Sequence, residues 1–313
     1  MGKIKTLLKL IREDRGALRK AFFSNWRKTP FSRLYSDKLY IKKQFRVFVG
    51  KKLDLNNPQT FNEKLQWLKL YDRRPEYSMM VDKYAVKEYI SKEIGEEYVI
   101  PTFGVWDRFE KIEFDKLPDQ FVLKCTHDSG SIVICRDKKT FDYIAAKNKL
   151  KKSLKRNMFW HGREWPYKCL KPRIIAEAYM KQEDCDDLTD YKFYCFNGEP
   201  KFLYVSSGLS NHSTAHLQYV TLDWEKLPAR RMDFPEMDVL PEKPKTFDKM
   251  IDFAKQLSKG IPFLRVDFYE IKGRLYFSEL TFFPGAGLTK FNPDEWEYKI
   301  GSWIELPKDK KKV

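Results

Sequence analysis

The chain has 313 residues, of which 42% are hydrophobic and 16% aromatic, so it is long enough for two or three lobes around a buried core and is not a disordered chain. It has no run of 18 or more apolar residues, which excludes a membrane-spanning helix, and no apolar secretory signal near its start. Five scattered cysteines without a Cys-x-x-Cys pair argue against disulfides and a zinc site. We therefore expect a cytoplasmic globular protein.

The net charge of +16 is concentrated near the N-terminus, where residues 1–60 hold 16 Lys and Arg against four acidic residues and so carry +12 of it. Apolar residues from Ile4 to Phe22 recur near helical spacing, which predicts a basic amphipathic helix within a basic helical segment, residues 1–56. Such a helix either lies on an anionic membrane or packs on its own domain. In the first case, residues 1–28 would contact the inner face of the plasma membrane. Both interpretations stay open, and we expect no nucleic acid partner.

The middle of the chain predicts two lobes. Residues 57–115 are expected to form an N-terminal lobe, in which the capping box Thr60-Phe-Asn-Glu63 begins a helix to about Asp72 and a second helix spans about Tyr77–Ile94. Residues 116–180 are expected to form a small lobe. There QFVLKCTHDSGSIVICRD predicts a strand, a polar loop and a strand, and a lysine-rich helix near 141–156 and a strand at 173–180 follow.

Residues 181–313 predict a strand-rich C-terminal lobe. Asn197-Gly198 between two apolar stretches is a hairpin signal, and a helix is expected over about Thr246–Lys259. Two further strands are expected at Phe263–Glu270 and Leu275–Thr281. The order of helices, a mixed unit and a strand-rich half predicts an α+β fold.

Charged residues interrupt these last two apolar strands. The period of a strand places Arg265 and Asp267 on one face, away from Leu264, Val266 and Phe268. A two-residue loop at Lys272-Gly273 would set Glu279 on the core face, whereas a three-residue loop or one bulge sets Glu279 opposite Asp267 and Thr281 opposite Arg265. A buried, unpaired charge costs several kcal/mol. We therefore predict the second register.

Two facing carboxylates repel each other unless a cation lies between them. Oxygen ligands of this kind favour Mg²⁺, which binds through one or two carboxylates and substrate phosphates, and Arg265 beside them suits a phosphate oxygen. An ion pair of Arg265 with Asp267 or Glu279 within the sheet explains the same pattern. The pattern alone does not separate the two interpretations.

A phosphate-binding loop is predicted upstream. Lys124 ends an apolar strand and is followed by Ser129, Gly130 and Ser131, whose backbone N–H groups can cradle phosphates. The loop is not a Walker loop, because GxxxxGK[ST] is absent. Taken alone, such a loop is more commonly an ordinary Ser-Gly hairpin turn.

Several of these features lie in stretches of sequence that resemble a known protein family. The stretches NPQTFNEKLQWLKLYDR, VDKYAV, LPDQFVLKCTHDSGS, GREWPYK, PRIIAEAYM, DYKFYCFNGEPKF and RVDFYEIKGRLYFSELTFFPGAG, over about Asn57–Gly287, resemble the TupA-like group of the ATP-grasp superfamily, found among bacterial surface-polysaccharide genes. The resemblance implies ATP clamped between two α+β lobes. It also implies an ATP- and Mg²⁺-dependent ligase that joins a carboxylate to an amine through an acylphosphate. Its substrate would be an acidic sugar or amino acid of a cell-surface polysaccharide, such as a capsule, or of a sugar precursor.

The resemblance also implies residue roles for the nucleotide. Lys83 and Lys124 would hold the phosphates beneath the loop Thr126–Ser131, with Lys192 near them. Glu177 would lie at the adenine hinge and Asp190 at the ribose. The other residues implied to bind ATP are loop and hinge positions: Ser129, Gly130, Ser131, Tyr179 and Met180.

For the chemistry, the resemblance implies catalytic roles for Arg265, Lys124 and Gly285. Arg265 would steady the transferred phosphoryl group, and the N–H of Gly285 would face the developing oxyanion. The implied Mg²⁺ ligands are Asp267, Glu279 and Thr281. Thr281 stands where the superfamily usually has Asn, and its hydroxyl can ligate Mg²⁺ directly or through water.

Three other functions stay open. A kinase on the same fold needs a general base, which His127 beside the phosphate loop can supply. A glycosyltransferase is suggested by the DxD pattern at Asp184-Cys185-Asp186, although a solvated acidic loop explains it too. A nonenzymatic membrane- or nucleic-acid-binding protein explains the basic N-terminus but not the carboxylates of the final hairpin. His212 and His216 could form a metal-binding pair, but the sequence shows no third ligand for them. The stretch Trp160–Trp165 either shapes an acceptor pocket or fills the core.

Overall fold

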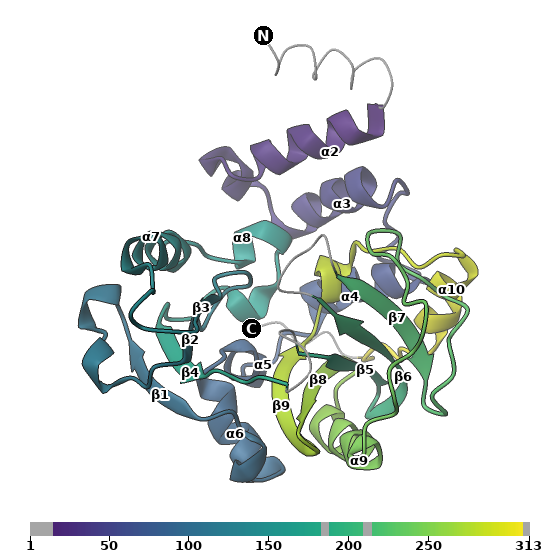
Figure 1. The fold of residues 1–313 in the computed structure, drawn as a ribbon. Coiled ribbons are helices and arrows are strands. Elements are labelled where there is room, and N and C mark those ends of the chain that lie inside the picture. Colours follow the sequence, from purple (N-terminus) through teal and green to yellow (C-terminus); the bar gives the residue numbers. More distant parts are fainter. Residues whose placement is uncertain (1–14, 183–187, 209–214, 309–313) are drawn as a thin grey trace.

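Two antiparallel sheets, one in each of two lobes, organise the chain (Figure 1). The structure is a computed structural model, and it describes residues 15–182, 188–208 and 215–308. The smaller sheet has the strand order β1-β4-β2-β3. Its strands are β1 (Thr102–Trp106), β2 (Phe121–Cys125), β3 (Val133–Cys135) and β4 (Ile174–Ala178). Helix α7 (Tyr143–Leu154) packs Ala146 and Leu150 onto Phe121 and Leu123 of this sheet.

The larger sheet has the order β7-β6-β5-β8-β9 and forms the second lobe. Its strands are β5 (Asp190–Phe196), β6 (Glu199–Ser207), β7 (His216–Thr221), β8 (Phe263–Ile271) and β9 (Arg274–Thr281). Helix α9 (Phe247–Ser258) covers one face, where the rings of Phe247 and Phe193 are 5.7 Å apart. Helix α4 (Phe61–Tyr71) covers the other, where the rings of Phe61 and Phe263 are 5.0 Å apart. All seven residues of β5 are therefore buried.

Several local predictions are confirmed. The capping box begins α4, because the Thr60 side chain accepts from the Glu63 N–H and the Glu63 side chain accepts from the Thr60 N–H. Residues Asn197 and Gly198 join β5 and β6, and α9 and the strand–loop–strand unit form where the sequence indicates. The C-terminal lobe ends with α10 (Glu295–Ser302), which packs on α4.

The single helix predicted over Tyr77–Ile94 is wrong. The chain forms α5 (Glu76–Val81) and α6 (Ala85–Glu93) with a break at residues 82–84. At the break the Asp82 carboxylate accepts from the N–H groups of Tyr84 and Ala85, and also from the Thr126 hydroxyl. The two local bonds compete with helical backbone bonds at this point, and the bond from Thr126 ties the break to a distant loop.

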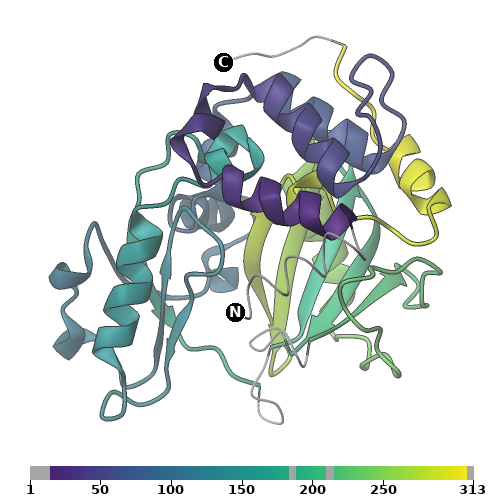
Figure 2. The same ribbon diagram turned by 90° about the horizontal axis from the view of Figure 1, so that it is seen from above.

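The N-terminal segment packs as α2 (Arg15–Trp26), η1 (Pro30–Leu34) and α3 (Asp37–Phe48). Helices α2 and α3 lie side by side in both views (Figures 1 and 2), with the rings of Phe23 and Tyr40 5.5 Å apart. The residues from Ile4 to Asp14 of the predicted amphipathic helix lie outside the described residues. Within the described residues, no helix has both the length and the apolar composition needed to cross a bilayer.

Short helical turns connect these elements. They are η2 (Glu96–Tyr98), η3 (Phe109–Lys111), η4 (Phe114–Lys116), α8 (Phe159–Gly162), η5 (Trp165–Tyr167) and η6 (Pro284–Gly287). The two lobes meet where Val99 forms an isolated parallel bridge with Phe277 of β9, and where the rings of Tyr77 and Phe282 are 4.2 Å apart.

The final hairpin has the predicted register. Asp267 pairs with Glu279 and Arg265 with Thr281. The turn itself is short, because Ile271 pairs with Arg274, and the register changes at a bulge between Asp267 and Phe268. The bulge therefore supplies the one-residue shift that keeps Glu279 off the core face.

Candidate nucleotide and metal site

One face of the larger sheet changes from apolar to charged along its strands. Near α4 it carries Phe196 and Phe263, which pair across β5 and β8. Farther along the same face, Lys192 pairs with Asp267, and Asp267 with Glu279. The register therefore brings six predicted site residues together on three adjacent strands: Asp190, Lys192, Arg265, Asp267, Glu279 and Thr281.

Asp267 is the buried centre of this cluster and has no exposed surface. The Nε and a terminal nitrogen of Arg265 donate to its two oxygens at 2.7 and 2.6 Å, and Lys192 Nζ donates at 3.1 Å. Burial alone would lower the pKa of the Arg265 guanidinium, but the charge of Asp267 outweighs it, so this pKa lies well above its usual value. The ion pair within the sheet is therefore present, whether or not a metal joins it.

Glu279 faces Asp267 but has no cation of its own. Its half-buried carboxylate forms no hydrogen bond or ion pair within the part of the chain that the structure describes. The Thr281 hydroxyl accepts from Arg265 at 2.9 Å. Among the described residues no group of three or more His, Cys, Asp or Glu could enclose a metal. The oxygen donors of Asp267, Glu279 and Thr281 thus fit Mg²⁺, provided that phosphate oxygens complete its shell.

The predicted phosphate loop, residues 126–131, follows β2 of the smaller sheet. Lys83 is held against it, because its backbone N–H donates to Thr126 O at 3.0 Å and its ammonium to Asp128 O at 2.5 Å. The Ser131 hydroxyl accepts from the Cys125 N–H and donates to Asp128 Oδ1. The Ser131 hydroxyl is thus engaged in hydrogen bonds within the loop, whereas Ser129 and Gly130 form the exposed tip of the loop.

Lys124 and Glu177 meet beside this loop. Lys124 Nζ lies 2.5 Å from Glu177 Oε2, and Lys87 Nζ lies 2.7 Å from Oε1. Burial alone would raise the pKa of the Glu177 carboxyl, but the charges of Lys124 and Lys87 outweigh it and hold this pKa below its usual value. Two ammonium groups on one carboxylate leave a net positive charge, which suits a phosphate. The sequence did not indicate Lys87.

The turn η6, which contains Gly285, is held by a polar stripe on α4. A Cβ on Gly285, where φ is +57°, would lie 2.1 Å from the Thr289 hydroxyl, so glycine is required there. Gln66 donates to the carbonyls of Ala286 and Gly287, at 3.1 and 2.6 Å. Lys69, fully buried, donates to Ala286 O at 2.6 Å. The sequence did not single out these α4 residues, because a lysine in a helix is usually solvated.

The other sequence candidates are spread apart. His127 is buried with Nε2 3.2 Å from Arg156 O. Trp165 belongs to the core, and the ring of Trp160 packs against it. Tyr179, which the resemblance implies to be a hinge residue, accepts from Arg136 at 3.3 Å, whereas Asp190 belongs to the cluster above and accepts from Lys192 at 2.6 Å. The Asp184-Cys185-Asp186 pattern and His212 lie outside the described residues, and His216 begins β7.

Comparisons with known proteins define the family. The family model described as TupA-like ATPgrasp matches residues 63–305, which is most of the chain. The chain therefore belongs to the TupA-like ATPgrasp family, and its two-lobed α+β architecture is an ATP-grasp fold. No curated protein matches its sequence.

Among solved structures, the chain is similar to a D-alanine–D-alanine ligase from Bacillus anthracis complexed with ATP, at 17% identity and a TM-score of 0.37, covering 65% of this chain and 55% of that one. An L-amino acid ligase from Bacillus licheniformis matches at 12% identity and a TM-score of 0.43, covering 81% and 55%. A D-alanine–D-alanine ligase from Helicobacter pylori matches at 12% identity and a TM-score of 0.42, covering 78% and 69%. The first of these matches spans little more than half of its relative.

Proposed function

We propose that the protein is an ATP- and Mg²⁺-dependent ligase that joins a carboxylate to an amine. The observation that carries the proposal is the pairing of Asp267 with Glu279 across β8 and β9, next to Arg265 and Lys192. Family membership adds the nucleotide, because the family is defined by the ATP-grasp fold. An arrangement with this many cations beside two carboxylates suits a reaction that brings anions together.

In the proposed reaction, a substrate carboxylate oxygen attacks the γ-phosphorus of ATP, and ADP leaves. The amine nitrogen then attacks the acyl carbon, the phosphate leaves with the former carboxylate oxygen, and one amine proton passes to solvent. Lys83 and Lys124 would hold the ATP phosphates, and Arg265 and Lys192 the transferred phosphoryl group. The Gly285 N–H would stabilise the oxyanion. Mg²⁺ bound at Asp267, Glu279 and Thr281 would neutralise phosphate charge.

The proposed substrate is an acidic sugar or amino acid of a cell-surface polysaccharide or of its precursor. Support for this comes from the family resemblance of the sequence rather than from contacts in the site. The same resemblance supports a cytoplasmic location, where ATP and sugar precursors are available. The buried position of His127, with Nε2 against a carbonyl, makes it a poor general base for the alternative kinase.

We also propose that the N-terminal segment contacts an anionic membrane. Its described surface exposes Phe22, Phe31, Leu34 and Leu39 by 55 to 82% of their area, and exposed cations such as Arg33 lie among them. Apolar side chains set among cations suit the headgroup region of an anionic bilayer. We expect sedimentation with phosphatidylglycerol vesicles but not with phosphatidylcholine vesicles, and loss of this binding in Phe31→Ser/Leu34→Ser. Equal binding to both vesicles, or none to either, contradicts the proposal.

Phosphorus NMR of ATP turnover tests the ligase. Candidate uronic acids and amines would be supplied with Mg²⁺ to the wild type and to Glu279→Gln. ADP and inorganic phosphate that require both substrates, and that are lost in the variant, would support the ligase. ADP with a stable phosphorylated acceptor would identify a kinase, and failure of the wild type to bind Mg²⁺-ATP would remove the nucleotide function altogether.

A further inference from the structure

The segment between α7 and β4 reaches the Gly285 turn. A Cβ placed on Gly162, at the end of α8, would lie 3.2 Å from the Cβ of Ala286, so α8 and η6 are in contact. The ammonium of Lys69 joins the two, because it donates to Gly162 O at 3.0 Å and to Ala286 O at 2.6 Å. The residues that follow Gly162 therefore lie at the end of the site where Gly285 is expected to act.

Glu164 lies at this junction with a carboxylate that lacks a partner. Its Oε1 is 2.6 Å from the position of the added Gly162 Cβ, so the side chain folds back over Gly162. Among the described residues it forms neither a hydrogen bond nor an ion pair. Lys69 does not donate a hydrogen bond to the Glu164 carboxylate, because its three N–H donors are taken by Gln66 Oε1, Gly162 O and Ala286 O.

Glu164 also lies within electrostatic range of Glu279 on β9. Burial raises the pKa of the Glu164 carboxyl, the charge of Lys69 opposes this rise, and the charge of Glu279 adds to it. Burial also raises the pKa of the Tyr167 phenol well above its usual value, and the charges of Glu279 and Glu164 raise it further. Arg265 acts on the same phenol in the opposite direction. Tyr167 is therefore within electrostatic range of both Glu164 and the β8–β9 hairpin.

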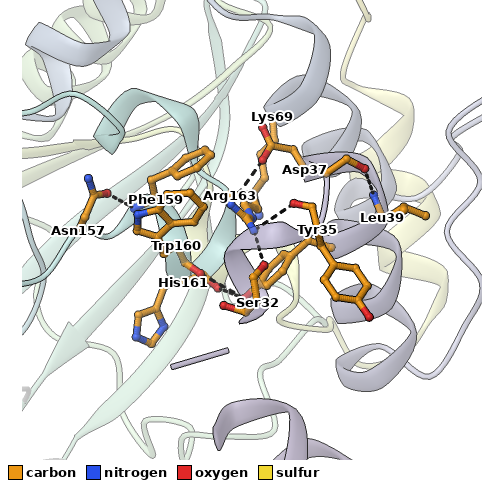
Figure 3. Close-up of polar contacts among 12 residues, drawn as sticks. Ser32, Tyr35, Asp37, Leu39, Lys69, Asn157, Phe159, Trp160, His161 and Arg163 are labelled. Carbon is orange, nitrogen blue, oxygen red and sulfur yellow. Dashed lines mark hydrogen bonds and ion pairs between the residues drawn. The ribbon is translucent and has the colours of Figure 1, made fainter. Parts of the chain in front are cut away.

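Glu164 is not needed to hold its own segment. Tyr40 and Gln44 of α3 each donate to His161 O at 3.0 Å. The guanidinium of Arg163 donates to Ser32 O at 2.8 Å, and Figure 3 shows it directed at Ser32 and Tyr35. With α8 and Arg163 fixed to the N-terminal segment in this way, the backbone next to Glu164 is held without using the Glu164 carboxylate.

We infer that Glu164 binds the ammonium group of the acceptor, which is a primary amine. The inference rests on the proposed ligase function, because it assigns the second substrate of that reaction. Other nearby carboxylates are engaged: Asp190 and Asp267 by Lys192, and Glu177 by Lys124 and Lys87. Glu279 is assigned to Mg²⁺. An amine carries a positive charge at neutral pH, and the Glu164 carboxylate, which forms no ion pair among the described residues, lies at the Gly285 end of the site where it can pair with that charge.

A binding experiment that needs no turnover tests the inference. The protein would be loaded with Mg²⁺ and a non-hydrolysable ATP analogue, and titrated with glucosamine and with ethanolamine. Their uncharged counterparts, N-acetylglucosamine and N-acetylethanolamine, would be titrated in parallel. We expect the wild type to bind the amines and not the acetylated compounds. Glu164→Gln should raise the dissociation constants of the amines at least tenfold. Glu113→Gln, a change in an exposed carboxylate of the small lobe, serves as the control.

The outcomes separate the inference from the proposed function. The inference is overturned if the wild type binds neither amine, if it binds the acetylated compounds as tightly, or if Glu164→Gln binds the amines unchanged. It is also overturned if Glu164→Gln loses affinity for the nucleotide analogue to the same extent, because Glu164 would then serve the nucleotide site or the fold. Failure of the wild type to bind the analogue would instead overturn the proposed function.

Discussion

Asp267 and Glu279 face each other across β8 and β9, yet only Asp267 is neutralised by cations of the described chain. Arg265 and Lys192 donate three bonds to Asp267, whereas Glu279 receives none. The two carboxylates therefore have different tasks. Asp267 holds the cationic side chains in place, and we propose that Glu279 keeps its oxygens available for a metal.

Substituting the two carboxylates should separate stability from metal binding. Glu279→Gln removes no contact of the described chain, so we expect unchanged urea unfolding and at least a tenfold weaker binding of Mg²⁺-ATP by calorimetry. Asp267→Asn leaves buried Arg265 and Lys192 short of a counter-charge and should cost about 3–5 kcal/mol of unfolding free energy. Equal destabilisation by both substitutions, or unchanged Mg²⁺-ATP binding in Glu279→Gln, would contradict this division. Glu225→Gln, on an exposed turn, is the control.

Lys87 should matter to ATP as much as the sequence-predicted Lys124, because both ammonium groups bind Glu177. We expect Lys87→Met and Lys124→Met each to weaken ATP binding by about tenfold, which corresponds to about 1.4 kcal/mol. Lys92→Met, on the exposed side of α6, should have no effect. An unchanged ATP affinity in Lys87→Met would show that this lysine only neutralises Glu177.

Glu177 should also stabilise the fold in a pH-dependent way. Its pKa is lowered in the folded state despite its burial, so its contribution is fully present above the ordinary pKa of a glutamate. The contribution is lost as the pH falls through the lower folded-state pKa. We expect the melting temperature of the wild type to exceed that of Glu177→Gln at pH 6, and the difference to shrink towards pH 3. A difference that stays constant over this range would mean that the carboxylate charge is not the stabilising feature.

Glu297 should show the opposite dependence. Burial raises its pKa to about 7, although the Phe291 N–H and Asn62 donate to it. Its contribution to stability is fully present below its unfolded-state pKa, near 4.5, and is lost as the pH rises through about 7. The loss amounts to roughly 3 kcal/mol. Glu297→Gln keeps an acceptor without the charge, so we expect it to gain stability relative to the wild type between pH 5 and 8. Urea unfolding at these two pH values checks the sign.

The parts that the sequence predicted are those that depend on neighbours along the chain or on a simple energetic choice. The capping box at Thr60 is local, and the register of the last hairpin follows from the cost of burying Glu279. The break at Asp82 was missed because two of the groups that bind its carboxylate, the Thr126 hydroxyl and Arg173, lie far along the chain. No local pattern signals such contacts.

The site residues that the sequence missed share a different cause. Lys69 and Lys87 are common surface residue types, and each acquires its environment only when distant elements pack against it. Lys69 is buried because η6 and α8 close over α4. Lys87 becomes a partner of Glu177 because α6 packs beside β4. Their types and spacing alone therefore look like those of solvated helix residues.

Arg163 should be a major source of stability for the N-terminal segment. Its side chain is buried, lies over the rings of Tyr40 and Trp160 at 4.5 Å each, and donates to Ser32 O (Figure 3). A lysine cannot reproduce this combination of stacking and several planar donors. We expect Arg163→Lys to cost about 2–4 kcal/mol and to speed hydrogen exchange in α2 and α3.

The backbone at Arg163 allows a sharper version of this test. Its φ is +54°, so Arg163→Gly relieves left-handed strain while removing the guanidinium. If the side-chain contacts hold the segment, Arg163→Gly should expose α2 and α3 to exchange at least as much as Arg163→Lys does, whereas Arg46→Lys on the exposed face of α3 should leave exchange unchanged. Protection that survives in Arg163→Gly would mean that the contacts of Tyr40 and Gln44 with His161 O suffice to hold the segment.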